Sequence, residues 1–192
     1  FFFLIIFPSA AHASCNFKTS KYVNQINLPS SIKEINIETP NSRGYYKNFL
    51  KILTSMTDNI PPQLRKKFKA NVEVIYQFGK CNYKGKVWQN GDWRDHIEYK
   101  NGRAYRSLNV KLDDGNIMNS TKFKFLLPET RGGLNEILGS LIAKKIGFIS
   151  PETFEVFVNV NKVGSLMIFQ EDSQKELLER NQRREGPIFE GD

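Results

Sequence analysis

Residues 108–112 have the sequence Leu-Asn-Val-Lys-Leu, and residues 122–127 have the sequence Lys-Phe-Lys-Phe-Leu-Leu. Apolar side chains alternate with polar ones in both segments, which is the period of a β-strand with one buried face. The second strand stops at Pro128, because proline cannot donate a hydrogen bond to a neighbouring strand. The two segments therefore predict a β-sheet at the centre of the fold.

The same patterns extend to both sides of this pair of strands. Alternation of apolar and polar residues predicts further strands at 32–37, 72–78, 153–160 and 164–170. Apolar residues at helical spacing predict amphipathic helices at about 42–58, 134–146 and 174–183. Asn161-Lys162 is expected to form the turn between the last two strands. This order predicts an α+β fold with a mostly antiparallel sheet and helices packed on it. The apolar face of the 134–146 helix is expected to pack on one side of that sheet.

Composition and charge narrow the class of protein. The chain has 192 residues, of which 40% are hydrophobic and 25% charged, which suits one medium domain or one lobe of a larger protein. Its net charge of +8 favours a polyanionic partner such as a phosphate-rich ligand, an acidic polysaccharide, nucleic acid or an anionic membrane surface. Nucleic acid is the least expected of these, because the basic stretch at 65–69 contains one aromatic residue, Phe68, for base stacking.

The N-terminal segment has the pattern of a secretory signal peptide. Residues 1–7 form an apolar run, and Pro8 and small residues follow it, so we expect cleavage after Ala13. A buried N-terminal strand is the alternative. The run is too short to span a membrane, and the mature chain is expected to contain no transmembrane helix. These features predict an exported protein located in the periplasm, at the cell surface or in the medium.

The number of cysteines is consistent with an exported protein. The mature chain would contain two of them, Cys15 and Cys81, and in an oxidising compartment one disulfide is their simplest arrangement.

The chain starts with Phe rather than Met and stops in mid-pattern, so we expect a fragment of a longer protein. We divide it into a signal peptide at 1–13, an extension at 14–69 and a main domain at 70–192.

Familiar catalytic motifs for phosphate loops, dinucleotides, serine hydrolases and zinc proteases are missing from the sequence. No metal site is predicted, since the two histidines are His12, in the leader, and His96.

The segment 92–96, Asp-Trp-Arg-Asp-His, admits two interpretations. It could be a metal or phosphate site, or a corner in which Asp95 caps a turn and pairs with Arg94 or His96. We favour the corner, because Asp side chains commonly bond to the backbone of turns.

Lys111 is the more informative charged residue. If the apolar residues of strand 108–112 face the core, Lys111 faces out from the sheet, where a strand lysine could contact a polyphosphate. Glu136, in the first turn of the next helix, could hold it in place, as in the small lobe of a protein kinase. The alternative is a solvated strand lysine and a glutamate favoured by the helix dipole.

Several stretches in one order along the chain carry a family resemblance: Arg-Ser-Leu-Asn-Val-Lys-Leu at 106–112, Lys-Phe-Lys-Phe-Leu-Leu-Pro at 122–128, and the segments 143–151, 158–164, 169–171 and 175–179. They resemble the CotH-type (spore-coat protein H-like) atypical kinases, which are secreted or surface proteins with a divergent kinase-like fold. The resemblance covers about residues 70–192. Arg106 stands where that family usually has lysine.

The resemblance implies the N-terminal lobe of such a kinase, with Lys111, Glu136 and Glu171 at the nucleotide site. The longer protein would transfer a phosphoryl group from ATP, with a divalent metal such as Mg²⁺, to a protein acceptor. The catalytic aspartates would lie beyond Asp192, so the fragment itself would be inactive. The alternative is a non-catalytic envelope or surface module that binds an anionic polysaccharide or a partner protein through its basic face.

Overall fold

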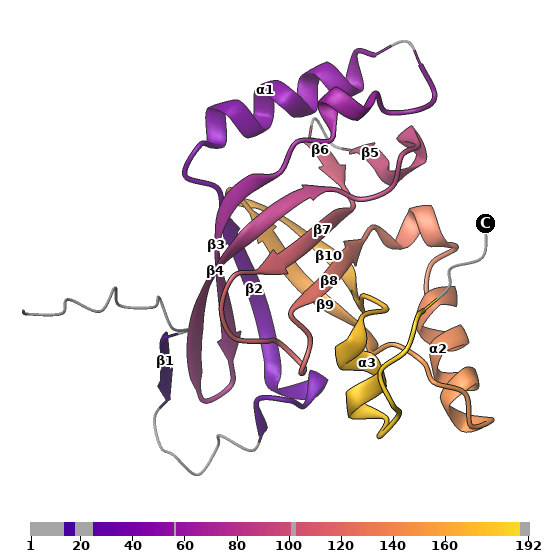
Figure 1. The fold of residues 1–192 in the computed structure, drawn as a ribbon. Helices are drawn as coiled ribbons and strands as arrows, with labels where there is room; N and C mark the ends of the chain where they lie inside the picture. The colour runs from indigo at the N-terminus through magenta and orange to yellow at the C-terminus, as the bar shows by residue number, and fades with distance from the viewer. Residues whose placement is uncertain (1–13, 18–24, 56, 101–102, 189–192) are drawn as a thin grey trace, which may run out of the picture.

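The chain folds around one large β-sheet (Figure 1). The structure is a computed structural model that describes residues 14–17, 25–55, 57–100 and 103–188. Its strands are β1 (Ser14–Phe17), β2 (Ile32–Glu38), β3 (Phe68–Tyr76), β4 (Gly79–Gln89), β5 (Ile97–Lys100), β6 (Arg103–Arg106), β7 (Leu108–Leu112), β8 (Lys122–Leu126), β9 (Thr153–Val160) and β10 (Val163–Glu171). Its α-helices are α1 (Ser42–Leu53), α2 (Asn135–Lys145) and α3 (Lys175–Arg180). Most of the predicted ranges overlap these elements, but the helix predicted to end near 58 ends at Leu53, the strand predicted at 72–78 begins at Phe68, and β1, β4, β5 and β6 were not predicted.

The sheet closes on itself. Eight strands follow the order β1-β4-β3-β2-β9-β10-β8-β7, and β7 also pairs with β4, so that seven of them form a closed barrel. Its described strand pairs are antiparallel except for β2 and β9, which run parallel. The long strand β4 makes closure possible. One edge of β4 pairs with β1 over its first residues and with β7 over its last ones.

The predicted fold class, an α+β kinase lobe with helices packed on a sheet, is therefore wrong. The six strands predicted from alternation are present, but β4, which closes the barrel, and the short strands β1, β5 and β6 were not predicted. Alternation shows only which side chains share a face of a strand. It does not show that the two outer strands of the sheet pair with each other. In the barrel, the buried faces pack against one another inside the lumen, so the sheet needs no helix to cover its apolar side.

The barrel interior is filled by apolar side chains from all seven strands. Aromatic rings pack at its centre, where Phe169 stacks on Phe123 and on Phe154 with ring centroids 4.9 and 4.7 Å apart. Phe125 meets the edge of Phe169 at 5.9 Å. The β9–β10 hairpin that carries Phe169 turns at Asn161-Lys162, as predicted, and both residues have the positive φ of a type I′ turn.

Helix α1 lies across one end of the barrel (Figure 1). It starts where Asn41 caps it, because the Asn41 Oδ1 accepts a hydrogen bond from the Gly44 N–H at 2.9 Å. Tyr45, Phe49 and Ile52 form its buried face. Their spacing of four and then three residues places them on one side of the helix, toward the barrel.

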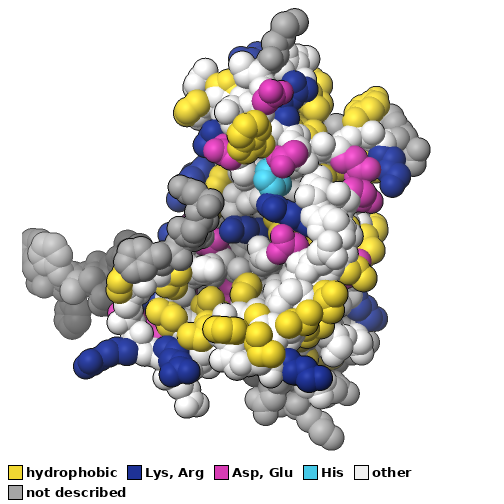
Figure 2. Space-filling view, turned by 90° about the vertical axis from the view of Figure 1, so that its right-hand side faces the viewer, with side chains coloured by type: hydrophobic (Ala, Val, Ile, Leu, Met, Phe, Trp, Pro, Cys, Tyr) yellow, Lys and Arg dark blue, Asp and Glu magenta, His cyan; other side chains and the backbone are white. Residues whose placement is uncertain are grey.

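Helix α2 does not pack as the sequence predicts. Leu138 and Leu141, in the middle of its apolar face, are 55% and 56% exposed. The helix contacts the barrel through small and polar side chains instead: the Ser140 and Thr153 hydroxyls are 2.9 Å apart, and Gln170 donates to Glu136 at 3.0 Å. In Figure 2, hydrophobic side chains gather in a band low on the molecule, at the height of α2 in Figure 1. The expected burial of this face is therefore wrong.

The disulfide prediction is confirmed. Cys15 and Cys81 lie directly opposite each other on β1 and β4 and are joined by a disulfide. This bond indicates a non-reducing environment. The predicted signal peptide at 1–13 lies outside the described residues. Strand β2, from the predicted 14–69 extension, is hydrogen-bonded between β3 and β9 within the barrel.

None of the described helices is long and apolar enough to cross a membrane.

Candidate functional site: a cationic cleft on the barrel wall

Four lysines form a row across the outer surface of the barrel. Lys69 lies opposite Lys86, Lys86 opposite Lys111, and Lys111 opposite Lys122, on the adjacent strands β3, β4, β7 and β8. Their neighbours along each strand point into the core, so the lysines point outward. Adjacent strands are about 4.8 Å apart, so the row is about 14 Å long. We call these four residues the lysine row.

The lysine row is only partly neutralised. Lys86 is 3.8 Å from Asp113, and Lys122 is 2.6 Å from Asp172. Among the described residues, Lys69 and Lys111 have no acidic partner within 4 Å. Like charges directly opposite each other destabilise a sheet, so this arrangement opposes folding unless an anion lies against it.

A second outward row runs beside the first. It consists of Trp88, Asn109 and Lys124, which are cross-strand neighbours on β4, β7 and β8. The Lys67 ammonium lies 4.8 Å from the centre of the Trp88 ring, a cation–π contact. The two rows therefore form one polar surface on which lysines outnumber other charged residues.

The second row and Lys122, at the end of the lysine row, line an open cleft of about 740 Å³. Lys122, Lys124 and Arg131 supply its permanent positive charges, and Asp172 supplies its carboxylate. Figure 2 looks onto this side of the molecule, where the single described histidine, in cyan, lies next to dark-blue Lys or Arg side chains. Three cations against one carboxylate leave the cleft positive.

Asp172 fixes the lysines of the cleft. Its Oδ2 is 2.6 Å from the Lys122 Nζ and its Oδ1 is 3.3 Å from the Lys124 Nζ. The Gln174 side chain donates to Asp172 Oδ2 at 2.9 Å, and Asp172 is 5% exposed. One buried carboxylate therefore orients two ammonium groups, which reduces the entropy that each would lose on binding an anion.

His96 forms the end of the cleft nearest Arg131. The Arg131 Nη2 is 3.5 Å from the His96 Nε2, and the buried His96 Nδ1 has no hydrogen-bond partner among the described residues. Gly91 lies against the ring: it has a φ of +71°, and a Cβ there would overlap His96. Burial, and then the charge of Arg131, lower the pKa of His96 below its ordinary value of 6.5.

This pKa shift predicts an acid sensitivity. Below pH 6.5 the unfolded chain takes up a proton on His96 that the folded protein resists, so the contribution of His96 to stability is lost as the pH falls. We expect the free energy of unfolding to fall more between pH 7 and pH 5 in the wild type than in His96→Gln. Urea denaturation of both proteins across this range measures the difference. Parallel pH profiles would contradict the assignment.

The three residues predicted at a nucleotide site lie in different surroundings. Lys111 belongs to the lysine row and is exposed. Glu136 accepts from Gln170 and lies 3.8 Å from the Arg131 Nε. Among the described residues, no ion pair joins Lys111 to Glu136. The structure therefore does not bring together the lysine and glutamate of the predicted pair.

Glu171 is a buried partner of helix α3. It is 2% exposed, its Oε2 is 2.6 Å from the Arg180 Nη2, and it accepts from the Glu152 N–H at 3.1 Å. Burial raises the pKa of Glu171, while the hydrogen bond from Glu152 and the charge of Arg180 act against that increase. The geometry shows Glu171 tying α3 to β10.

The 92–96 segment contains a short 3-10 turn, Arg94–His96, which has no side-chain cap, so Asp95 lies near His96 but does not cap the turn as the favoured interpretation expected. The Arg94 guanidinium donates to the carbonyls of Ser55 and Leu53, just after and at the end of α1. Asp95 lies 3.7 Å from the His96 Nε2. Within the described part of the chain, no three His, Cys, Asp or Glu side chains form a group that could hold a metal ion.

Sequence reasoning singled out Lys111 but missed its neighbours in the lysine row and the two lysines held by Asp172. The signal was present as Lys-x-Lys spacing at 84–86 and 122–124, which places both lysines on the outer face of a strand. Recognising the row needed the strand register.

The fold and the cleft together define a closed β-barrel protein with a cationic outer wall. Neither the models of known protein families nor the curated protein sequences match this chain. The resemblance to CotH-type kinases therefore stays a prediction.

Proposed function

We propose that this chain is an exported module that binds an anionic polysaccharide along its lysine row and adjoining cleft. The observation that carries the proposal is the row itself: four cross-strand lysines, two of which have no acidic partner among the described residues. Such a surface attracts a chain of negative charges, and releasing the counterions of that chain adds to the affinity.

The choice of polysaccharide over nucleic acid depends on two features. The disulfide favours an exported protein, and acidic polysaccharides are polyanions of the cell envelope and its surroundings. The two rows contain one aromatic residue, Trp88, and Lys67 lies over its ring. A platform for single-stranded nucleic acid would instead stack successive bases on several aromatic side chains.

Phosphoryl transfer by a longer protein stays a prediction, together with its ATP, Mg²⁺ and protein acceptor. It depended on a kinase-like lobe, which the closed barrel replaces, and on a contact between Lys111 and Glu136, which the described residues do not form. The lysine row does not depend on either feature. The binding module is therefore the function that the geometry supports best.

A charge-reversal pair tests the proposal. In the row variant, Lys69, Lys86 and Lys111 are changed to Glu; in the control variant, the exposed lysines Lys33, Lys145 and Lys162 are changed to Glu. Both variants carry the same net charge. We expect the row variant to bind dextran sulfate at least about tenfold more weakly than the wild type, because it loses the contacts that release counterions.

The control variant should lose much less affinity, and neutral dextran should bind to none of the three proteins. Titration at two salt concentrations adds a second readout, because the wild type should show the steepest loss of affinity with salt. Equal losses in the row variant and the control variant would mean that net charge alone attracts the polymer, and the proposal would be abandoned.

A further inference from the structure

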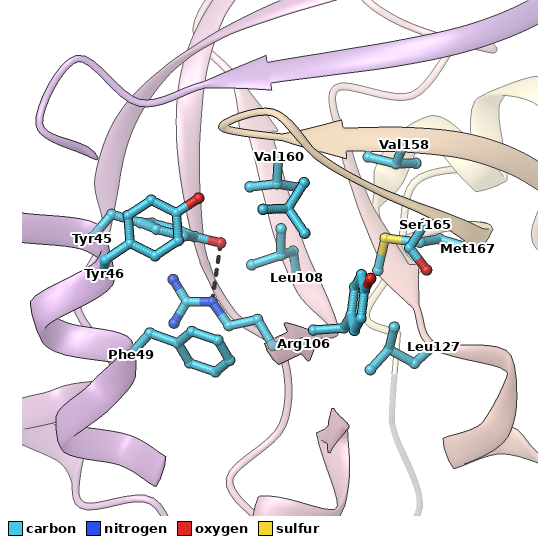
Figure 3. A pocket seen from close by; sticks show the side chains of 12 residues that line it. Tyr45, Tyr46, Phe49, Arg106, Leu108, Leu127, Val158, Val160, Ser165 and Met167 are labelled. Atoms are coloured by element: carbon cyan, nitrogen blue, oxygen red, sulfur yellow. Dashed lines mark hydrogen bonds between the residues drawn. The ribbon is translucent and has the colours of Figure 1, made fainter. Parts of the chain in front are cut away.

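A second, smaller pocket lies between α1 and the end of the barrel (Figure 3). Its volume is about 30 Å³, and a water molecule needs about 10–15 Å³ measured in this way, so the pocket has room for a group of a few heavy atoms. Aliphatic side chains from the barrel form most of its wall, among them Leu108, Leu127 and Val160. Tyr45 and Phe49 of α1 close it on the other side. The pocket is therefore a mostly apolar space.

Arg106 is the charged residue of this lining, which also includes the polar residues Tyr46, Tyr105 and Ser165. It is 5% exposed, and its guanidinium lies 4.0 Å from the centre of the Tyr45 ring and 4.7 Å from that of Phe49. Its Nε donates to the Tyr45 hydroxyl at 3.1 Å, the bond drawn dashed in Figure 3. Arginine keeps its charge under all ordinary conditions, so a full positive charge is buried here.

The charge of Arg106 is incompletely compensated. Its Nη2 is buried and has no hydrogen-bond partner, and among the described residues no carboxylate lies within ion-pair distance of the guanidinium. Two aromatic rings attract a cation but accept no strong hydrogen bond. A buried donor without a partner is costly and uncommon in folded proteins. In a pocket with free space, that donor points to an anionic ligand.

The Tyr45 hydroxyl supplies a second donor. Its oxygen accepts from Arg106, and among the described residues no acceptor is found for its own proton. A carboxylate has two oxygens and could accept from the guanidinium and from this hydroxyl together. The surrounding aliphatic wall would contact an apolar substituent on the carboxylate carbon. The pocket volume restricts that substituent to one or two carbons.

We propose that this pocket is a binding site for a small carboxylate of about the size of propionate, held by Arg106 and Tyr45. The site is separate from the lysine row: it lies at the end of the barrel, beneath α1, and the row lies on the wall. Its ligand is a small monoanion, whereas the lysine row suits a polymer. Either proposal can fail without the other.

Isothermal titration of the wild type with sodium propionate, in a chloride-free buffer of constant ionic strength, tests the site. We expect saturable binding of propionate and none of propionamide, which has nearly the same shape but no charge. Chloride should bind more weakly than propionate, because it has no apolar substituent to contact the wall. Saturable binding of propionamide, tighter binding of chloride, or no saturable binding of propionate would each overturn the proposal.

Variants assign the two donors. Arg106→Gln should abolish propionate binding, and Arg103→Gln, an exposed arginine on the same strand, should leave it unchanged. Because a change at a buried arginine can impair folding, Tyr45→Phe provides a milder test: it removes one hydroxyl and should weaken propionate binding about tenfold. Unchanged affinity in Tyr45→Phe, or binding retained by a folded Arg106→Gln protein, would contradict the assigned contacts.

Discussion

Removal of the Cys15–Cys81 disulfide is expected to lower the free energy of unfolding by about 4 kcal/mol, the loop-entropy value for a cross-link of this span. The two cysteines are 66 residues apart in sequence, so the bond excludes many extended conformations from the unfolded chain. The bond also fixes β1, a four-residue strand that pairs with β4 alone among the described strands. Its loss should therefore release β1 first.

Urea denaturation measures this effect in two independent ways. One compares the oxidised protein with the same protein in reductant; the other compares it with a double variant, Cys15→Ala and Cys81→Ala. Alanine is chosen because Cys81 is fully buried, where a serine hydroxyl would need a partner. The control is Asn82→Ala, an exposed neighbour on β4, which should change stability little. If reduction leaves the urea midpoint unchanged, the cross-link does not contribute as described.

Local patterns located six of the ten described strands, and the long strand β4 was among those they missed. The hairpin from β9 to β10 and the strands β7 and β8 have clear alternation, and each lies within a residue or two of its predicted range. The cap of α1 at Asn41 is another local feature, because its side chain is of the type that accepts from the first turn of a helix. These features depend on residues close together in sequence.

Closure of the barrel could not be predicted in this way. It depends on the pairing of β4 with β7 and of β2 with β9, which joins segments far apart in sequence. Alternating side chains suit an open sheet covered by helices as well as a closed barrel. The assumption of an open sheet led to the incorrect fold class and to the expectation that α2 buries its apolar face.

The candidate sites also combine features that local sequence predicts with features that depend on residues far apart in sequence. Lys111 could be recognised as an outward strand lysine, but its neighbours Lys86 and Lys122 become part of one row only through the register of three strands. Arg106 ends β6 next to the start of β7, and nothing in the local sequence indicates that it is buried. Its burial follows from α1 lying over the end of the barrel.

Among substitutions in the core, Phe169→Ala is expected to cause the largest loss of stability. The ring is fully buried and contacts Phe123, Phe125 and Phe154. Its removal leaves a cavity between rigid strands that cannot collapse to fill it, so the free energy of unfolding should fall by about 3–5 kcal/mol.

Leu138→Ala is the informative control for Phe169→Ala, because a helix packed on a sheet and a closed barrel predict different results for it. A leucine on a buried helix face would cost about 2–5 kcal/mol, whereas a half-exposed one should change stability by about 0.5 kcal/mol. With Leu138 at 55% exposure, we expect the smaller value. Urea denaturation of both variants gives the comparison. Similar losses for Phe169→Ala and Leu138→Ala would mean that α2 covers a core in solution, and the barrel would no longer explain the stability of the chain.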